Sequence, residues 1–183
     1  MITWNSQKPD FCRRPIEELA EQLPFNVACS VLLVPAQAPK VVIKRTVAEG
    51  ILQHLRERSV EMSGLLIGSV HDNGADENSF AISISDSVGS IEYDSTGVSL
   101  RMDTDVWERA RLKSREGCSV IGWYHSHPNL GAFFSGTDRR TQRAFFHHPH
   151  SIGLVIDPVR GEEKWFIGPE SQELGANRVW CHS

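Results

Sequence analysis

Two histidines lie one residue apart in the segment GWYHSHPNLGAFFSGTD, residues 122–138. On a β-strand, residues i and i+2 project to the same face, so His125 and His127 would present two imidazoles side by side. Imidazole nitrogens and carboxylate oxygens are common zinc ligands, and Asp138 ends the same segment. If the intervening loop folds back over the histidines, these three ligands leave the fourth position of a tetrahedral zinc open, which is typical of a catalytic site.

Such a metal with its bound water also needs a proton acceptor. A nearby carboxylate can take the proton and later pass it to a leaving amine. Several carboxylates are candidates, and spacing alone does not choose among them. Glu61 fits the pattern best, because it lies where a predicted helix gives way to the apolar strand SGLLIG.

Ser135 allows two interpretations. Ser135 and Asp138 are three residues apart at the start of a predicted helix, which is the spacing of a capping pair. The same hydroxyl is also a candidate donor to an oxyanion. The sequence leaves both roles open, and one side chain could fill both.

Hydrophobic periodicity predicts the elements that position these residues. Strands are expected at VVIKR, EMSGLLIGSV, FAISISDSVGSI, CSVIGWYHSH, SIGLVIDP and EEKWFIG, with another short one around VSLRM; helices are expected at PIEELAEQL, TVAEGILQHLRERS with Thr46 as its N-cap, TDVWERARLKSREG and SGTDRRTQRAFFHH. This alternation indicates the α/β (α+β) class, with a mixed central β-sheet flanked by helices. The absence of a Gly-rich phosphate loop argues against a nucleotide-binding fold.

The chain of 183 residues is predicted to form an N-terminal extension of unknown role, residues 1–39, and one domain, residues 40–183. Its 40% hydrophobic and 23% charged residues are ordinary for a globular protein. The net charge of −4 provides no basic face for nucleic acid or an anionic membrane. No stretch reads as a signal peptide or a membrane span, so we expect a cytoplasmic protein. Four scattered cysteines indicate neither a zinc ribbon nor a disulfide framework.

Several motifs together resemble the JAMM (MPN-plus) zinc metalloprotease family over roughly residues 40 to 170. They are Glu61 followed by SGLLIG, then G-W-Y-H-S-H-P, S-G-T-D-R-R-T-Q and V-I-D-P. The match is particularly similar to the family's proteasome-lid deubiquitinase and signalosome deneddylase. The resemblance implies the JAMM/MPN (cytidine-deaminase-like) fold and one zinc ion per chain, bound by His125, His127 and Asp138. It also implies that Glu61 acts on the zinc-bound water and that Ser135 stabilises the oxyanion.

The function implied by this resemblance is a zinc-dependent isopeptidase that cleaves after the C-terminal glycine of a ubiquitin-like protein, in conjugates or in precursors. The chain resembles bacterial members that accompany ubiquitin-like conjugation systems, some of them antiviral, so activating and conjugating enzymes are expected partners. The substrate tail is expected to add a strand to an edge between Ile91 and Asp103. One departure is Ala132-Phe133, where close eukaryotic relatives carry Cys-Trp.

Two other functions stay open. One is a JAMM peptidase acting on a sulfur-carrier protein in cysteine or cofactor synthesis, and the other is a non-catalytic MPN scaffold. The HHPH segment, with His147, His148 and His150, could indicate a second metal, but an exposed loop is the favoured interpretation. Several aromatic residues are expected to pack in the core: Trp123, Tyr124, Phe145, Phe146, Trp165 and Phe166.

Overall fold

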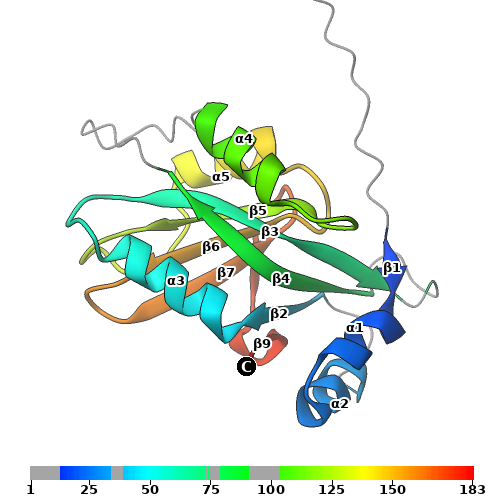
Figure 1. Ribbon diagram of the computed structural model, residues 1–183. Coiled ribbons are helices and arrows are strands. Elements are labelled where there is room, and N and C mark those ends of the chain that lie inside the picture. Colours follow the sequence, from blue (N-terminus) through cyan, green and yellow to red (C-terminus); the bar gives the residue numbers. More distant parts are fainter. Residues whose placement is uncertain (1–12, 34–38, 73, 75–78, 91–103) are drawn as a thin grey trace, which may run out of the picture.

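The computed structural model describes residues 13–33, 39–72, 74, 79–90 and 104–183, which form a curled mixed sheet with helices packed on it (Figure 1). The strands are β1 (Arg14–Pro15), β2 (Lys40–Lys44), β3 (Ser63–Asp72), β4 (Phe80–Gly89), β5 (Ser119–Ser126), β6 (Ile152–Asp157), β7 (Glu162–Ile167), β8 (Gln172–Leu174) and β9 (Val179–His182). The helices are α1 (Ile16–Gln22), α2 (Phe25–Leu33), α3 (Arg45–Leu55), α4 (Thr104–Lys113), α5 (Gly136–Phe145) and the 3-10 helix η1 (Ala176–Arg178). The predicted α/β class with a mixed central sheet is confirmed.

The strand that carries the histidines lies in the middle of the sheet. The strand order is β8-β7-β6-β5-β3-β4-β2-β9, with β1 paired to β3 outside this path. β5 runs antiparallel to β3 and parallel to β6. Because both neighbours hydrogen-bond to it, β5 is a rigid support for the side chains at its C-terminal end.

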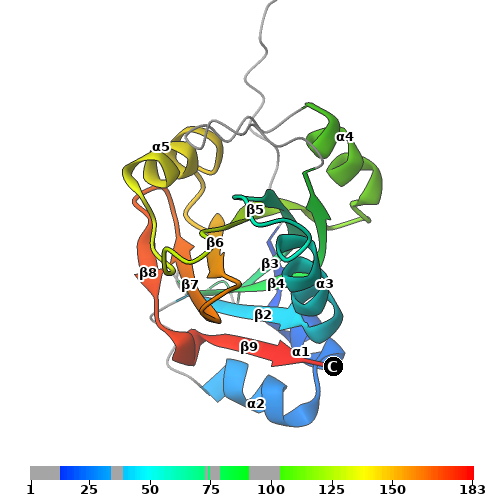
Figure 2. The same ribbon diagram turned by 90° about the vertical axis from the view of Figure 1, so that its left-hand side faces the viewer.

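The helices cover the two faces of the sheet. α3 buries Val47, Ile51 and Leu55 against one face, and α4 buries Val106 and Ala110 against the other. In the turned view, α5 lies at the upper left and α4 at the upper right, and α3 lies on the right below α4 (Figure 2). Successive side chains of each strand point to the two faces of the sheet in turn, so they pack against the helices of both layers.

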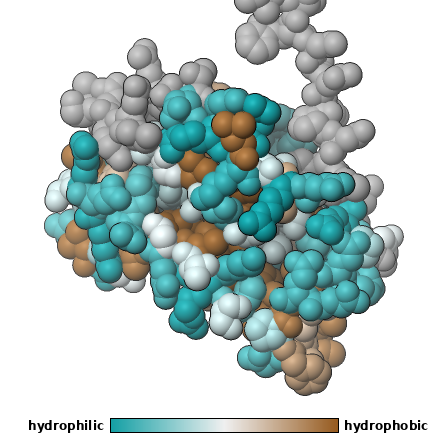
Figure 3. Space-filling view, viewed as in Figure 1, coloured by the Kyte–Doolittle hydropathy of each residue, from teal (hydrophilic) through white to brown (hydrophobic). Residues whose placement is uncertain are grey.

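The first two helices form a third apolar cluster with the far end of the sheet. Leu19 of α1 and Val31 of α2 are buried against Val42 and Ala81. The outer side of α2 stays apolar, since Phe25 is 85% and Leu33 is 81% exposed. This surface is the hydrophobic area at the lower right of the space-filling view (Figure 3).

Several predicted details are wrong. Thr46 is not the N-cap of α3, because the helix already begins at Arg45 and Lys44 takes the cap position without a side-chain hydrogen bond. Phe145 is 58% exposed rather than buried, while Phe146, Trp165 and Phe166 lie in the core as expected. EEKWFIG is not the last element, since β8, η1 and β9 follow it.

Two other expectations lie outside the described residues: the short strand around VSLRM and the substrate edge between Ile91 and Asp103. The division into residues 1–39 and 40–183 stays an interpretation. Among the helices of the described residues, none is both long enough and apolar enough to cross a membrane.

Candidate metal centre

The two histidines lie at the C-terminal end of β5, on one face of the sheet. His125 pairs with Ser63 of β3 on one side and with Val155 of β6 on the other. His127 follows the strand, and its backbone N–H donates to the carbonyl of Ile156 at 3.0 Å, which continues the pairing with β6. Both side chains are buried, with 2% and 4% exposure for the two residues.

Asp138 reaches the same point from the first turn of α5. Ser135 is the N-cap of this helix, and its hydroxyl accepts from the Asp138 N–H at 3.2 Å. In return, the Ser135 N–H donates to Asp138 Oδ2 at 2.6 Å, so the two residues form a capping box. The predicted cap is therefore present, and it fixes the carboxylate at the positive end of the helix.

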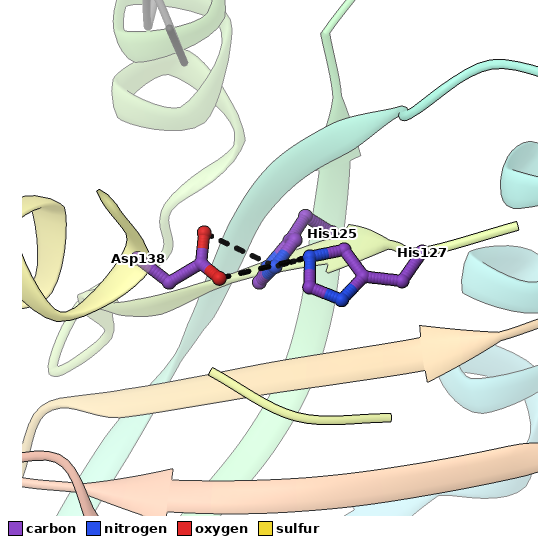
Figure 4. Close-up of side chains that lie close together, drawn as sticks. All are labelled: His125, His127 and Asp138. Atoms are coloured by element: carbon purple, nitrogen blue, oxygen red, sulfur yellow. Dashed lines mark hydrogen bonds and ion pairs between the residues drawn. The ribbon is translucent and has the colours of Figure 1, made fainter. Parts of the chain in front are cut away.

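The three side chains converge on one point (Figure 4). His125 Nε2 lies 3.2 Å from His127 Nε2, and Asp138 lies 3.4 Å from the first through Oδ1 and 3.6 Å from the second through Oδ2. Two imidazole nitrogens facing each other at this distance need a shared proton or a cation between them. Two nitrogens and a buried carboxylate are a donor set that zinc accepts, so the residues fit the metal implied by the resemblance.

The electrostatics agree with this arrangement. Burial would raise the pKa of Asp138, but hydrogen bonding and the charge of His125, with hydrogen bonds from Ser135, bring it down to about 2. Burial and then the neighbouring His125 lower the pKa of His127, against the opposing effect of Asp138. An ionised carboxylate at Asp138 and a neutral imidazole at His127 are the protonation states that bind metal.

The ring of His125 is held by a buried aromatic residue. Trp123 stacks on it with ring centroids 4.5 Å apart and an interplanar angle of 10°. The indole N–H of Trp123 donates to Gln142 Oε1 at 2.6 Å, and Gln142 Nε2 donates to the carbonyls of Ser151 and Gly168. Gln142 is fully buried one turn after Asp138 on α5. One face of this helix therefore carries the candidate ligand Asp138 and also the residue that binds Trp123, on which the His125 ring stacks.

Glu61 lies beside the three ligands rather than among them. Its Oε1 is 4.0 Å from His127 Nε2, and its side chain is 46% exposed. Burial, and to a smaller extent the charge of Asp138, raises the pKa of Glu61, although His127 acts in the opposite direction. A carboxylate with a raised pKa next to a metal site is suited to proton transfer.

Glu61 is attached to the histidine strand through its neighbour Met62. The Met62 N–H donates to the Ser126 hydroxyl at 3.0 Å, and the Ser126 N–H donates to the Met62 carbonyl at 2.8 Å. Ser126 is fully buried on the face of β5 opposite to the histidines. It therefore joins the segment of the candidate proton acceptor to the strand of the candidate ligands.

Sequence reasoning brought forward all five of the residues at this centre but missed Ser126 and Gln142. Ser126 carried a signal, because it is a polar residue within a predicted strand of the sheet. Gln142 carried none, because its neighbours in the predicted helix are polar or charged. Polar side chains in buried positions need hydrogen-bond partners inside the protein. The partners themselves are Met62 just before β3, Trp123 in β5, Ser151 just before β6 and Gly168 just after β7.

The HHPH segment does not form a comparable group. The rings of His147 and His148 stack at 4.7 Å, and those of His148 and His150 stack at 5.1 Å, so their faces meet rather than their nitrogens. The expectation of an exposed loop holds for His147 but is wrong for His150, which is 4% exposed and contacts Phe80 edge-to-face.

Comparison with known proteins identifies the family of this arrangement. A model of the prokaryotic homologues of the JAB domain matches residues 44–167. This range contains Glu61, both histidines, Ser135 and Asp138. The expected resemblance is confirmed.

Three curated proteins are similar to this chain in sequence. COP9 signalosome complex subunit 5 of Eremothecium gossypii is 30% identical over 151 residues, which are 79% of this chain and 33% of that protein. The 26S proteasome regulatory subunit rpn11 of Schizosaccharomyces pombe is 29% identical over 116 residues, 60% of this chain and 35% of that protein. The ubiquitin carboxyl-terminal hydrolase RPN11 of Saccharomyces cerevisiae is 28% identical over 106 residues, 55% of this chain and 32% of that protein. The chain thus spans about a third of the length of these relatives.

A solved structure supports the fold. The solution structure of a protein from Desulfitobacterium hafniense matches with a TM-score of 0.58 and 23% identity, over 78% of this chain and 93% of that one. At this identity, the match shows a shared fold and nothing about activity.

Proposed function

The chain belongs to the family of prokaryotic homologues of the JAB domain, and from that premise we propose that it is a zinc-dependent peptidase of ubiquitin-like proteins. The bond cleaved would follow the C-terminal glycine of the ubiquitin-like protein, in an isopeptide conjugate or in a precursor. The observation that carries this proposal is the buried convergence of His125, His127 and Asp138 with Glu61 beside them. A scaffold without catalysis would have no need of that complete set.

In this proposal His125, His127 and Asp138 hold one zinc ion. When bound, the metal supplies a Lewis acid that polarises the scissile carbonyl and makes a water molecule more acidic. The capping box keeps Asp138 in place, and Trp123 keeps the His125 ring in its plane.

Glu61 moves the proton. Its Oε1 lies 4.0 Å from His127 Nε2, from where it would accept a proton from the attacking water and return it to the departing amine. The raised pKa of Glu61 favours both steps near neutral pH, because the group must gain and lose the proton in one cycle. The Ser135 hydroxyl already accepts from Asp138, and its own hydrogen is the donor we assign to the oxyanion of the tetrahedral intermediate.

The substrate class follows from the surroundings of the centre and from one relative's name. Phe133 is 46% exposed with its ring 4.8 Å from that of His127, and Gly131 and Ala132 are buried next to it. A residue without a side chain would pass this loop most easily, which favours glycine before the scissile bond. The similarity to a ubiquitin carboxyl-terminal hydrolase supports a ubiquitin-like protein as the substrate that carries this glycine. The enzymes that activate and conjugate that protein would then be partners of this chain.

The first test separates proton transfer from metal binding. Glu61→Gln keeps the shape of the side chain but cannot accept a proton, so we expect retained zinc and a loss of turnover of about 10²–10⁴-fold. Zinc content by elemental analysis and cleavage of a ubiquitin fusion are measured on the same preparation. Glu57→Gln, which neutralises an exposed carboxylate near the end of α3, is the matched control and should behave as wild type. Loss of zinc and activity together would make Glu61 a ligand or a folding residue.

The second test addresses the substrate. Two ubiquitin fusions are compared, one with glycine and one with leucine before the scissile bond. We expect kcat/KM to fall strongly with leucine. Equal rates would contradict glycine selectivity and leave the zinc chemistry intact.

A further inference from the structure

Asp157, from the V-I-D-P motif, is a fully buried carboxylate that the mechanism above does not use. It ends β6, and backbone N–H groups surround it. Oδ1 accepts from Asn129 at 3.0 Å, Val159 at 2.9 Å and Arg160 at 3.0 Å, and Oδ2 accepts from Gly131 at 2.8 Å. Burial opposes ionisation, but these backbone donors lower the pKa of Asp157 to about 2.

The donors come from two different segments. Val159 and Arg160 belong to the turn between β6 and β7, whereas Asn129 and Gly131 belong to the β5–α5 loop, residues 127–135. One charged side chain therefore joins the turn to the loop. Hydrogen bonds from backbone N–H groups to a carboxylate are among the stronger ones in proteins.

The β5–α5 loop needs such an anchor because Asn129 adopts a backbone conformation that residues other than glycine rarely adopt. Asn129 has φ of 62° and Gly131 has φ of 90°, both in the left-handed region. A Cβ on Gly131 would also lie 3.3 Å from Glu162 Oε2. Two further contacts hold the loop: Arg160 Nη2 donates to the Asn129 carbonyl at 2.9 Å, and the Ala132 N–H donates to Glu162 Oε2 at 3.3 Å.

The same loop packs directly against His127. The Leu130 N–H donates to the His127 carbonyl at 3.2 Å, and the Phe133 ring lies 4.8 Å from the imidazole. In metal sites, groups behind a histidine decide where its ligating nitrogen points.

We propose that Asp157 is a positioning residue which, through the backbones of Asn129 and Gly131, fixes the β5–α5 loop so that His127 Nε2 faces His125 and Asp138. The inference rests on the metal site of the proposed function. It adds a residue from β6 that contacts neither the three ligands nor Glu61 through its side chain.

The test compares Asp157→Asn with a core variant at the other end of the sheet. The asparagine keeps the size of the side chain but replaces one acceptor oxygen by a donor, which would face backbone N–H groups. We expect about a 10–100-fold weaker zinc affinity, measured by competition with a chromophoric chelator. Val42→Ala removes packing from the α1–α2 cluster and should lower the melting temperature while leaving zinc affinity unchanged. Equal losses of affinity in the two variants would overturn the proposal, since they would reflect stability alone.

Hydrogen exchange provides a readout that does not need the metal. In Asp157→Asn the amides of Asn129 and Gly131 should exchange faster, whereas Val42→Ala should leave them protected. Unchanged exchange of these amides in Asp157→Asn would overturn the inference. Failure of the wild-type protein to bind zinc is a separate outcome, which would contradict the proposed function and leave the exchange test usable. If Asp157→Asn does not fold, the wild-type protein still provides a test. The amides of Asn129 and Gly131 should then exchange as slowly as those of β5, and exchange as fast as in an open loop would overturn the proposal.

Discussion

The two ends of helix α5 both carry histidines nearby, but they differ in what those histidines can do. At the N-terminal end, the rings of His125 and His127 meet at 73° and their Nε2 atoms converge with the Asp138 carboxylate. At the C-terminal end, the rings of His147, His148 and His150 stack nearly in parallel, at 28° and 10°. Of the described residues, only the first group brings three such ligand atoms within 4.8 Å of one another.

The difference shows that a high density of histidines does not by itself make a metal site. Strand alternation aims two imidazoles in one direction, and the helix N-terminus adds a carboxylate where negative charge is favoured. A loop imposes no such direction, so the imidazoles pack face to face. We therefore expect the two groups to respond differently to substitution, metal and pH.

The largest contrast should appear in metal content. We expect one zinc per chain in the wild-type protein and close to none in His125→Ala, because the remaining two ligands hold zinc too weakly to survive purification. His148→Ala, at the other end of α5, should keep one zinc per chain. Elemental analysis of protein purified without added metal measures both. A wild-type zinc content near zero, unchanged by His125→Ala, would show that the histidines at the N-terminal end of α5 are not a zinc site.

A smaller effect is expected at the cap of α5. Ser135→Ala should lower kcat by about 10²-fold if the hydroxyl donates to the oxyanion, and it should cost about 1 kcal/mol of stability as a lost N-cap. Thr137→Ala changes a hydroxyl two residues further on, which accepts from Arg140, and should do neither. Steady-state kinetics and thermal melts separate the two roles. A stability loss with wild-type kcat would leave Ser135 as a cap alone.

The last effect concerns pH and the C-terminal end of α5. Burial, followed by the charges of His148 and Arg13, lowers the pKa of His150 from 6.5 to about 4. Between these two values the unfolded chain binds a proton that the folded chain does not bind. The free energy of unfolding should therefore decrease as the pH falls from about 6.5 to about 4, by at most about 1.4 kcal/mol per pH unit for this one group. Above this range, His150 should contribute no pH dependence.

Denaturant titrations across this pH range check the prediction. His150→Phe should flatten the slope, because the ring that titrates is gone while the contact with Phe80 stays aromatic. His147→Gln, at an exposed position of the same segment, should keep the wild-type slope. An identical slope in wild type and His150→Phe would show that other groups titrate there.

Local pattern was sufficient for much of the fold. The apolar and alternating segments predicted β2 to β7 and helices α1, α3, α4 and α5. Helices such as α3 bury one periodic face, and strands such as β3 and β6 are continuous buried runs. The cap of α3 was misplaced, since the helix begins without a side-chain cap and thus without a sequence signal. The last strands were missed because β8 and β9 have only three and four residues, too few for a period to appear.

The sequence by itself determined which residues are candidates for the chemistry: the spacing of His125, His127 and Asp138 already requires a strand, a returning loop and a helix N-terminus. Only the tertiary structure decided how these residues are supported. The Ser126 hydroxyl bonds to Met62, Gln142 bonds to Trp123, and Asp157 bonds to the β5–α5 loop, in each case between segments far apart in the chain. Periodicity records which face of an element is buried, but it holds no information on which distant donor meets a buried acceptor, and that pairing arises only when the sheet assembles.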